Sequence, residues 1–123
     1  ERAGDVCRDS QLRPAIVDNT SGTARGVLDV TDLDAIHRRA QIGIALLPEA
    51  QGKGIATKAL DEAVMYALQQ GLHQLFAVVA SDNLKARKLF LRSSYLETTV
   101  LPQWLYVDGK FTDAILYQRI LEK

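Results

Sequence analysis

Pro48-Glu49-Ala50-Gln51-Gly52-Lys53-Gly54-Ile55-Ala56 is the most informative stretch of this chain. It follows the apolar run 42–47 and precedes a long helical pattern. Gly52 and Gly54 permit a tight turn with exposed backbone N–H groups, and the first turn of a helix leaves further N–H groups without partners. Because the helix dipole adds about half a positive charge at this end, the stretch is predicted to bind a phosphate group.

The charges near this turn support the same interpretation. Lys53 and Lys58 flank it, and the first acidic residue of the helical pattern is Asp61. Helices usually carry Asp or Glu in their first turn. We therefore expect the negative charge to come from a bound anion. A glycine-rich connection between a strand and a helix, with no ligand, stays open as the alternative.

Two common phosphate motifs do not fit this stretch. A P-loop requires Gly-x-x-x-x-Gly-Lys followed by Ser or Thr, whereas Lys53 lies between the two glycines and is followed by Gly54. A dinucleotide fingerprint requires Gly or Ala where Thr57 stands, and an acidic residue at the end of a second strand about 20 residues later, which this sequence lacks. A nucleotide-binding module is therefore the weaker alternative.

The composition is that of an ordinary globular protein, and residues 1–123 are predicted to form a single domain. Fifteen basic and fifteen acidic residues cancel, which predicts neither a nucleic acid nor an anionic membrane as partner. Cys7 is the one cysteine, so an intrachain disulfide and a cysteine-based zinc site are excluded, and no other cluster suggests a metal. Without a signal peptide or an apolar run of about 18 residues, we expect a cytoplasmic protein.

The hydrophobic pattern predicts an α/β fold. Apolar residues recur at three- and four-residue spacing across 55–70, and Gly71 is a natural stop for this helix. The strands expected on either side, 39–47 and 75–80, imply a right-handed crossover that makes them parallel. Because 75–80 is apolar throughout, we expect it to be covered on both faces. The other expected elements are the tail of a helix in 1–12, strands at 13–18, 24–33, 95–101 and 111–121, a helix at 83–93, and a loop with an Asp108-Gly109 turn before the last strand.

A resemblance to a known family adds to this interpretation. Gln51, Gly54 and Ala56 form a Gln-x-x-Gly-x-Ala pattern that resembles the coenzyme A pyrophosphate loop of the GNAT superfamily of N-acetyltransferases. The similarity is to the branch of bacterial spermidine N-acetyltransferase and its ribosomal-protein and aminoglycoside relatives. Its further landmarks are the segments 37–41, 48–54, 83–86 and 108–113.

The resemblance covers about residues 13–120 and implies a GNAT-like fold. That fold is a mixed, mostly antiparallel sheet with a central parallel strand–helix–strand crossover. The first strand and two helices of the family have no counterpart here, so the resemblance implies an N-terminally shortened member. The strand edge that those elements would flank is then open, and we expect a homo-oligomer to cover it.

The resemblance implies acetyl-CoA as the cosubstrate. Backbone groups of Leu46 and Leu47 would hydrogen-bond the pantetheine arm, and the N–H of Leu46 would polarise the thioester carbonyl. Asn83 would bind the pantetheine where the parallel strands separate, with Lys85 and Lys88 nearby. A helix cap for Asn83 and a solvated helix surface for the two lysines stay open as alternatives. The implied cofactor-binding residues are Leu46, Leu47, Gln51, Gly52, Lys53, Gly54, Ile55, Ala56, Asn83, Lys85, Ala86 and Lys88.

Two catalytic positions depart from the pattern of the relatives. Gln41 stands where they carry a Glu that takes the amine proton, and Phe90 stands where they carry a Tyr that protonates the leaving thiolate. Neither side chain titrates, although a thiol with a pKa of about 8.5 leaves tolerably without an acid. Asp29 and Asp32 match acidic positions of the polyamine enzymes, so they are the candidates to hold or deprotonate the amine. Ordinary exposed carboxylates are the alternative for both.

These features predict an acetyl-CoA-dependent N-acetyltransferase in which a primary amine, polyamine-like or another small amine, attacks the thioester directly. Tyr95 and Tyr106 could replace the missing acid, although core or loop positions are expected for both. Because Gln41 and Phe90 do not titrate, a catalytically impaired, GNAT-like coenzyme A-binding sensor or structural protein is the alternative. The sequence does not identify the acceptor.

Overall fold

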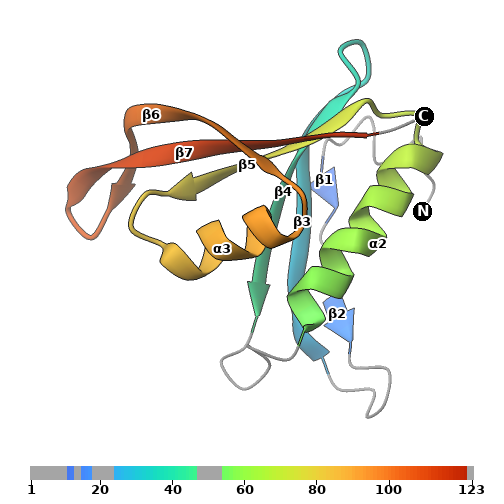
Figure 1. The fold of residues 1–123 in the computed structure, drawn as a ribbon, viewed down its shortest axis with the longest axis horizontal. Coiled ribbons are helices and arrows are strands. Elements are labelled where there is room, and N and C mark those ends of the chain that lie inside the picture. Colours follow the sequence, from blue (N-terminus) through green and yellow to red (C-terminus); the bar gives the residue numbers. More distant parts are fainter. Residues whose placement is uncertain (1–10, 13–14, 18–23, 47–53, 122–123) are drawn as a thin grey trace.

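The computed structural model describes residues 11–12, 15–17, 24–46 and 54–121. These residues form a seven-stranded sheet and two helices. The strands are β1 (Gln11–Leu12), β2 (Ala15–Val17), β3 (Ala24–Asp34), β4 (Arg39–Leu46), β5 (Gln74–Ala80), β6 (Leu96–Val107) and β7 (Lys110–Ile120), and the helices are α2 (Ile55–Gln69) and α3 (Leu84–Arg92). The strand order is β1-β3-β4-β5-β7-β6, and β2 also pairs with β3 (Figure 1).

β4 and β5 form the parallel pair that the crossover predicts, and the other described pairs are antiparallel. The parallel register is short, because it joins only Arg39–Gln41 to Gln74–Phe76. Beyond Gln41 and Phe76 the two strands are not paired with each other. The mixed, mostly antiparallel fold is therefore confirmed, and its two central strands separate toward their carboxyl ends.

Helix α2 confirms the strongest helical pattern of the sequence. Its buried residues include the small side chains Ala59, Ala63 and Ala67, which let the helix lie close to the sheet. At its end, Gly71 has a φ of +76° and its N–H donates to the carbonyl of Leu68. The N–H of Leu72 donates to the carbonyl of Ala67, so the two bonds form a Schellman motif.

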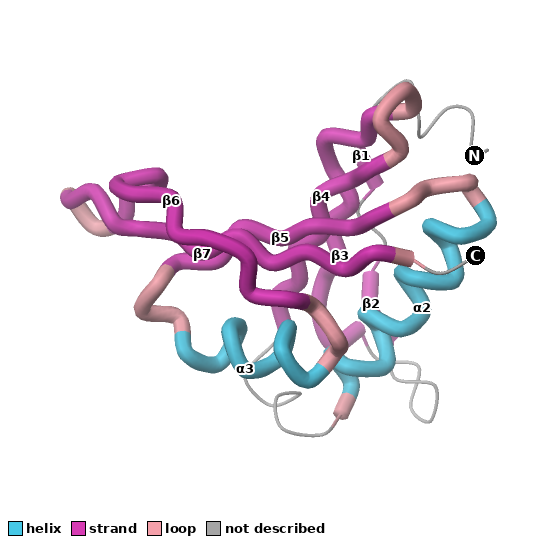
Figure 2. Tube along the Cα trace, turned by 45° about the horizontal axis from the view of Figure 1, so that its top comes forward, coloured by secondary structure: helices cyan, strands magenta, loops and turns pink. Residues whose placement is uncertain are grey.

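Both helices pack on one side of the sheet, as Figure 2 shows. On that side, alternate residues of the central strands are buried against them, because side chains of a strand alternate between its faces. Burial of this apolar surface is the main favourable contribution to the fold. The strand and helix residues of this core include Val30, Ala40, Ile42, Leu60, Leu75, Ala77, Phe90, Ile115 and Tyr117.

The prediction that 75–80 is covered on both faces is wrong for the described part of the chain. Leu75, Ala77 and Val79 are buried, whereas Phe76 and Val78 are only half-buried. The reason is that an apolar run in the sequence does not show which other elements will cover each face of the strand. Here the described helices cover one face, and the other stays partly open.

The predicted loop between 101 and 111 is also wrong, because β6 continues to Val107. Its register with β7 shifts between Leu101 and Leu105, and Gln103 has a φ of +50° there. The Asp113 carboxylate accepts a hydrogen bond of 2.9 Å from the Gln103 N–H, which holds this bulge. Proline is tolerated in an edge strand, so Pro102 does not end the strand. Two further predictions are wrong. Tyr95 lies before β6 and does not begin the strand, and Gln11–Leu12 forms a short strand instead of the tail of a helix.

Two searches of the described residues were negative. None of their helices has the length and apolar character that a bilayer crossing requires. No three His, Cys, Asp or Glu side chains among them gather as metal ligands.

Candidate functional site

The gap between β4 and β5 is the first part of the candidate site. Residues 42–46 of β4 pair with β3 along one edge, from Val30 opposite Ile42 to Gly26 opposite Leu46. Along the other edge the described residues provide no strand partner, since pairing with β5 ends at Gln41. Backbone N–H and C=O groups on such an edge require other partners, so this edge suits an extended ligand.

The second part is the amino end of α2. The helix begins at Ile55 after Gly54, whose φ of +76° favours glycine. The described part of the chain places no side-chain cap and no acidic residue in this first turn. Among the described residues, a Cβ added to Gly54 would meet nothing within 4 Å. These features fit a phosphate group, and they are the properties expected of the pyrophosphate end of coenzyme A.

Part of the predicted loop cannot be compared with this geometry. Leu47, Gln51, Gly52 and Lys53 lie outside the described residues. Leu46 is the last residue of β4, at the open end of the gap. Ile55 and Ala56 are the first residues of α2.

The third part is the amino end of α3. The side-chain oxygen of Asn83 accepts a hydrogen bond of 3.2 Å from the Ala86 N–H, so Asn83 caps this helix. This is the cap that the sequence left open as an alternative to ligand binding. Lys85 and Lys88 are both exposed on the helix surface. Their contact with a ligand stays a prediction.

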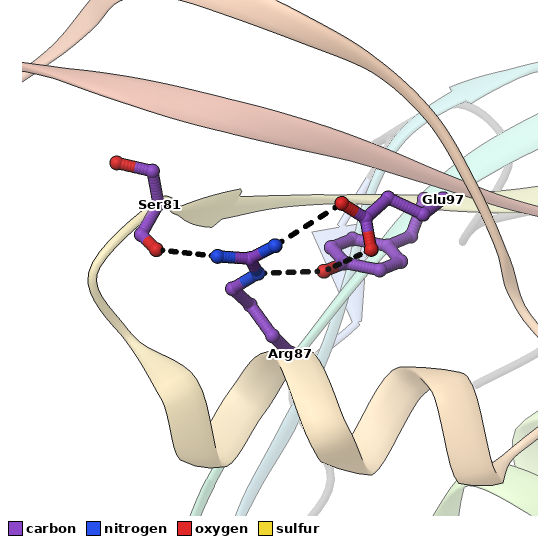
Figure 3. A network of polar contacts seen from close by, with 4 residues as sticks. Ser81, Arg87 and Glu97 are labelled. Atoms are coloured by element: carbon purple, nitrogen blue, oxygen red, sulfur yellow. Dashed lines mark hydrogen bonds and ion pairs between the residues drawn. The ribbon is translucent and has the colours of Figure 1, made fainter.

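Arg87 of α3 joins four elements around this end of the sheet (Figure 3). Its guanidinium donates to the Ser81 carbonyl at 2.9 Å, to the Glu97 carboxylate at 3.1 Å and to the Tyr117 hydroxyl at 3.2 Å. The hydrogen bond with Tyr117 is the main cause that raises the pKa of Arg87, and the interaction with Glu97 adds to it. Sequence reasoning missed this cluster because its members come from a helix, a turn and two different strands, and they carry no spacing signal.

Phe90 lies in the core beneath this cluster. It is 3% exposed, and its ring stacks on Tyr117 with centroids 5.9 Å apart and meets Tyr95 edge-on at 5.0 Å. The Tyr95 hydroxyl is buried without a hydrogen-bond partner, and burial raises the pKa of Tyr95. A phenol that holds its proton this firmly is a poor acid. Tyr106 is exposed on β6.

The structure places two of the predicted acceptor-side residues on one face. Asp29 lies opposite Gly43, and Gln41 lies opposite Thr31 on the same two strands. Since Leu28 and Val30 are buried against the helices, Asp29 and Gln41 lie on the other face. Asp32 does not join them in regular register, because it is exposed in the irregular end of β3 with a φ of +51°.

A hollow of about 360 Å³ opens on this same face. It is lined by Arg39, Gln74, Phe76, Leu116 and Gln118. Gln118 donates a hydrogen bond of 2.9 Å to Gln74 and accepts one of 2.8 Å from Thr98. Sequence reasoning missed the hollow, since three separate strands and no motif supply its walls.

Known proteins are similar to this chain in sequence and in fold. The spermidine N(1)-acetyltransferase of Vibrio cholerae is 28% identical over 106 residues, which are 85% of this chain and 61% of that protein. The ribosomal-protein-serine acetyltransferase of Escherichia coli is 26% identical over 98 residues, 79% of this chain and 55% of that protein. The chain thus spans little more than half the length of these relatives.

Solved structures of spermidine N-acetyltransferase from Vibrio cholerae share the fold. One, in complex with CoA and spermine, matches with a TM-score of 0.85 and 24% identity over 96% of this chain and 70% of that chain. Another, a dodecameric structure, matches with a TM-score of 0.84 and 25% identity over the same shares. The model of the acetyltransferase (GNAT) family matches residues 7–95. This chain therefore belongs to the acetyltransferase (GNAT) family.

Proposed function

We propose that this chain is an acetyl-CoA-dependent N-acetyltransferase that transfers an acetyl group to a primary amine. The observation that carries the proposal is the gap between β4 and β5, which leads from an unpaired backbone edge to the uncapped amino end of α2. Family membership supports it, as does the similarity to a protein solved with CoA and spermine.

The proposed cofactor contacts follow the gap. Leu46 and Leu47 would bind the pantetheine arm through their backbone groups, as a peptide strand would be bound. The amino end of α2, with the turn before it, would hold the pyrophosphate. Asn83 would add its remaining amide hydrogens, since its oxygen caps α3. The full set is Leu46, Leu47, Gln51, Gly52, Lys53, Gly54, Ile55, Ala56, Asn83, Lys85, Ala86 and Lys88.

The proposed reaction is direct attack without a covalent enzyme intermediate. An alkylammonium, with a pKa of about 10.4, must lose a proton before its nitrogen can attack. Asp29 would hold the amine and take that proton through water, because Gln41 beside it cannot titrate. The nitrogen then bonds to the thioester carbon, the carbon–sulfur bond breaks, and the electron pair leaves on sulfur. The second proton of the nitrogen passes through water to the thiolate, which gives the neutral amide and the coenzyme A thiol. The Leu46 N–H would stabilise the carbonyl oxygen. Asp32 is the second candidate carboxylate.

A coenzyme A-binding protein without catalysis is the second candidate. It is favoured by the buried, non-titrating Phe90 at the position where relatives carry the acid. Thiol release from acetyl-CoA with a panel of amines, measured beside calorimetric binding of coenzyme A, separates the two. Binding with no acetylation of any amine would overturn the enzyme. Preferential binding of ATP or NAD would instead support the nucleotide-binding alternative.

We also propose a homo-oligomeric, cytoplasmic protein in which residues 1–123 act as one domain. The hairpin of β6 and β7 extends beyond the helices in Figure 1, and its outer strand is an open edge. A long apolar edge of this kind favours association. A monomer in light scattering at micromolar concentration would contradict this assembly. The exposed apolar side chains of the hairpin are Leu96, Val100, Trp104, Tyr106, Val107, Phe111 and Ile120.

A further inference from the structure

We infer that the hollow beside Arg39 binds a carboxylate of the acceptor, so that the acceptor is an amino carboxylate instead of a polyamine. The inference rests on the proposed function, because it names the chemical class of the amine. Three observations carry it: the face on which the hollow opens, the charge of its lining, and its continuity with Gln41 and Asp29.

The hollow opens on the sheet face that the described helices leave uncovered. In β5, Gln74 and Phe76 alternate with the buried Leu75 and Ala77. Register places Gln41 beside Phe76 on the parallel strand, and Gln118 beside Phe76 on β7. The hollow therefore begins at the last paired residues of the parallel strands, where the gap for the cofactor also begins.

Arg39 supplies the only formal charge among the lining residues that the structure describes. Within the part of the chain that the structure describes, Asp34 pairs with it at a nitrogen–oxygen distance of 3.9 Å. The other oxygen of Asp34 accepts hydrogen bonds of 3.0 and 2.9 Å from the N–H groups of Ile36 and His37, so this carboxylate is held by its own turn. A guanidinium that is so loosely paired has donors left for a planar carboxylate.

The remaining walls suit the body of such a ligand. Phe76 and Leu116 offer apolar surface to a methylene chain. Gln74, Gln118 and Thr98 form a neutral hydrogen-bonded row that adds no negative charge. A polycation would meet the Arg39 charge with nothing in this lining to balance it.

The amine end of the acceptor lies toward Asp29. Gly43, which Asp29 faces, is four residues from Arg39 along β4. At about 3.3 Å per residue, the amine and the carboxylate would lie about 13 Å apart. An elongated amino carboxylate spans this distance along one face of the sheet.

The test compares acceptors of matched length. The series are ω-amino acids, diamines and simple alkylamines with four to ten methylene groups, each assayed for thiol release from acetyl-CoA and for calorimetric binding to the coenzyme A complex. We expect the ω-amino acids to bind and react about tenfold better than the alkylamines, with an optimum near the longer chains. Diamines should fall below the alkylamines.

Two variants locate the effect, and a third is the control. In Arg39→Gln, the activity with ω-amino acids divided by the activity with alkylamines should fall to about one. Gln74→Glu keeps a hydrogen-bond partner for Gln118 but adds negative charge. This variant should therefore use alkylamines better than ω-amino acids. Arg38→Gln, an exposed neighbour outside the lining, should keep the preference of the unmodified protein.

Each outcome bears on a separate claim. Equal or better use of diamines, or a carboxylate preference that Arg39→Gln does not change, would overturn the inference while leaving the acetyltransferase intact. If no amine is acetylated, the proposed function fails, and Arg39-dependent binding of the ω-amino acids alone would still support the hollow. No such binding would then overturn both.

Discussion

The two faces of strand β5 differ although they belong to one apolar run. Leu75, Ala77 and Val79 are buried under the helices, whereas Phe76 and Val78 lie half-buried on the other face. The covered face holds the core and the aromatic group around Phe90. The open face carries Asp29, Gln41 and the hollow. One face of these strands therefore forms the core, and the proposed acceptor site lies on the opposite face.

Removing a large ring from each face gives the largest expected contrast. Phe90→Ala should lower the free energy of unfolding by about 3 to 5 kcal/mol, because Phe90 is 3% exposed and its ring contacts two tyrosines. Phe76→Ala, the matched change on the open face, should cost about 1 to 2 kcal/mol. Urea denaturation of both variants measures the difference. Equal losses would show that the open face is as well packed as the covered one.

The Arg87 cluster lies on the covered side and ties α3 to β6, to β7 and to the turn after β5. Arg87→Ala removes three hydrogen bonds and leaves the fully buried Tyr117 hydroxyl without its strongest partner. We expect the melting temperature to fall by about 5 °C. Arg92→Ala, an exposed arginine of the same helix, is the control and should change it by less than about 1 °C. If the two variants melt together, the cluster contributes nothing to stability.

Tyr95 offers a gain on the covered side. Its hydroxyl is buried without a hydrogen-bond partner. Tyr95→Phe therefore removes an unsatisfied polar group and keeps the aromatic contact with Phe90. The free energy of unfolding should rise by about 1 kcal/mol. Calorimetric melting is the measurement, and a loss of stability would mean that the hydroxyl has a partner, such as a buried water.

The smallest expected effect is the pH response of Asp34, beside the open face. A backbone hydrogen bond from His37 is the main cause that holds the pKa of Asp34 below its ordinary value of 3.8. A lowered pKa in the folded state contributes stability above the ordinary value, and that contribution is lost as the pH falls through the folded value. The difference in melting temperature between the unmodified protein and Asp34→Asn should therefore shrink from pH 6 to pH 3. Asp61→Asn on the surface of α2 is the control, and a constant difference for Asp34→Asn would contradict the assignment.

Predictions from the sequence succeeded where neighbours along the chain decide the structure. The crossover through α2 and its end at Gly71 followed from spacing and from one glycine, and both are confirmed. The Asp108-Gly109 turn is confirmed too, with positive φ at both residues. The proposed phosphate end of α2 was equally visible, because a helix end exposes its N–H groups whatever lies around it.

Predictions failed where residues far apart in the sequence determine the structure. Because β6 is an edge strand, it can contain Pro102, whereas the sequence around this proline predicts a loop. Asn83 was ambiguous in the sequence; its contact with the Ala86 N–H confirms the cap, and its contact with a ligand stays a proposal. The Arg87 cluster was missed because Glu97 and Tyr117 reach it only after three strands have assembled.

The sequence by itself therefore determined the local structure of this protein, because helix periodicity, caps and tight turns depend on residues within a few positions of one another. Which face of β5 stays open, and which arginine lines the hollow, depended on the assembled sheet. Arg39 and Gln118 lie 79 positions apart in the chain and meet through β5. No pattern along one segment encodes such a meeting, because it arises from the register of three strands at once.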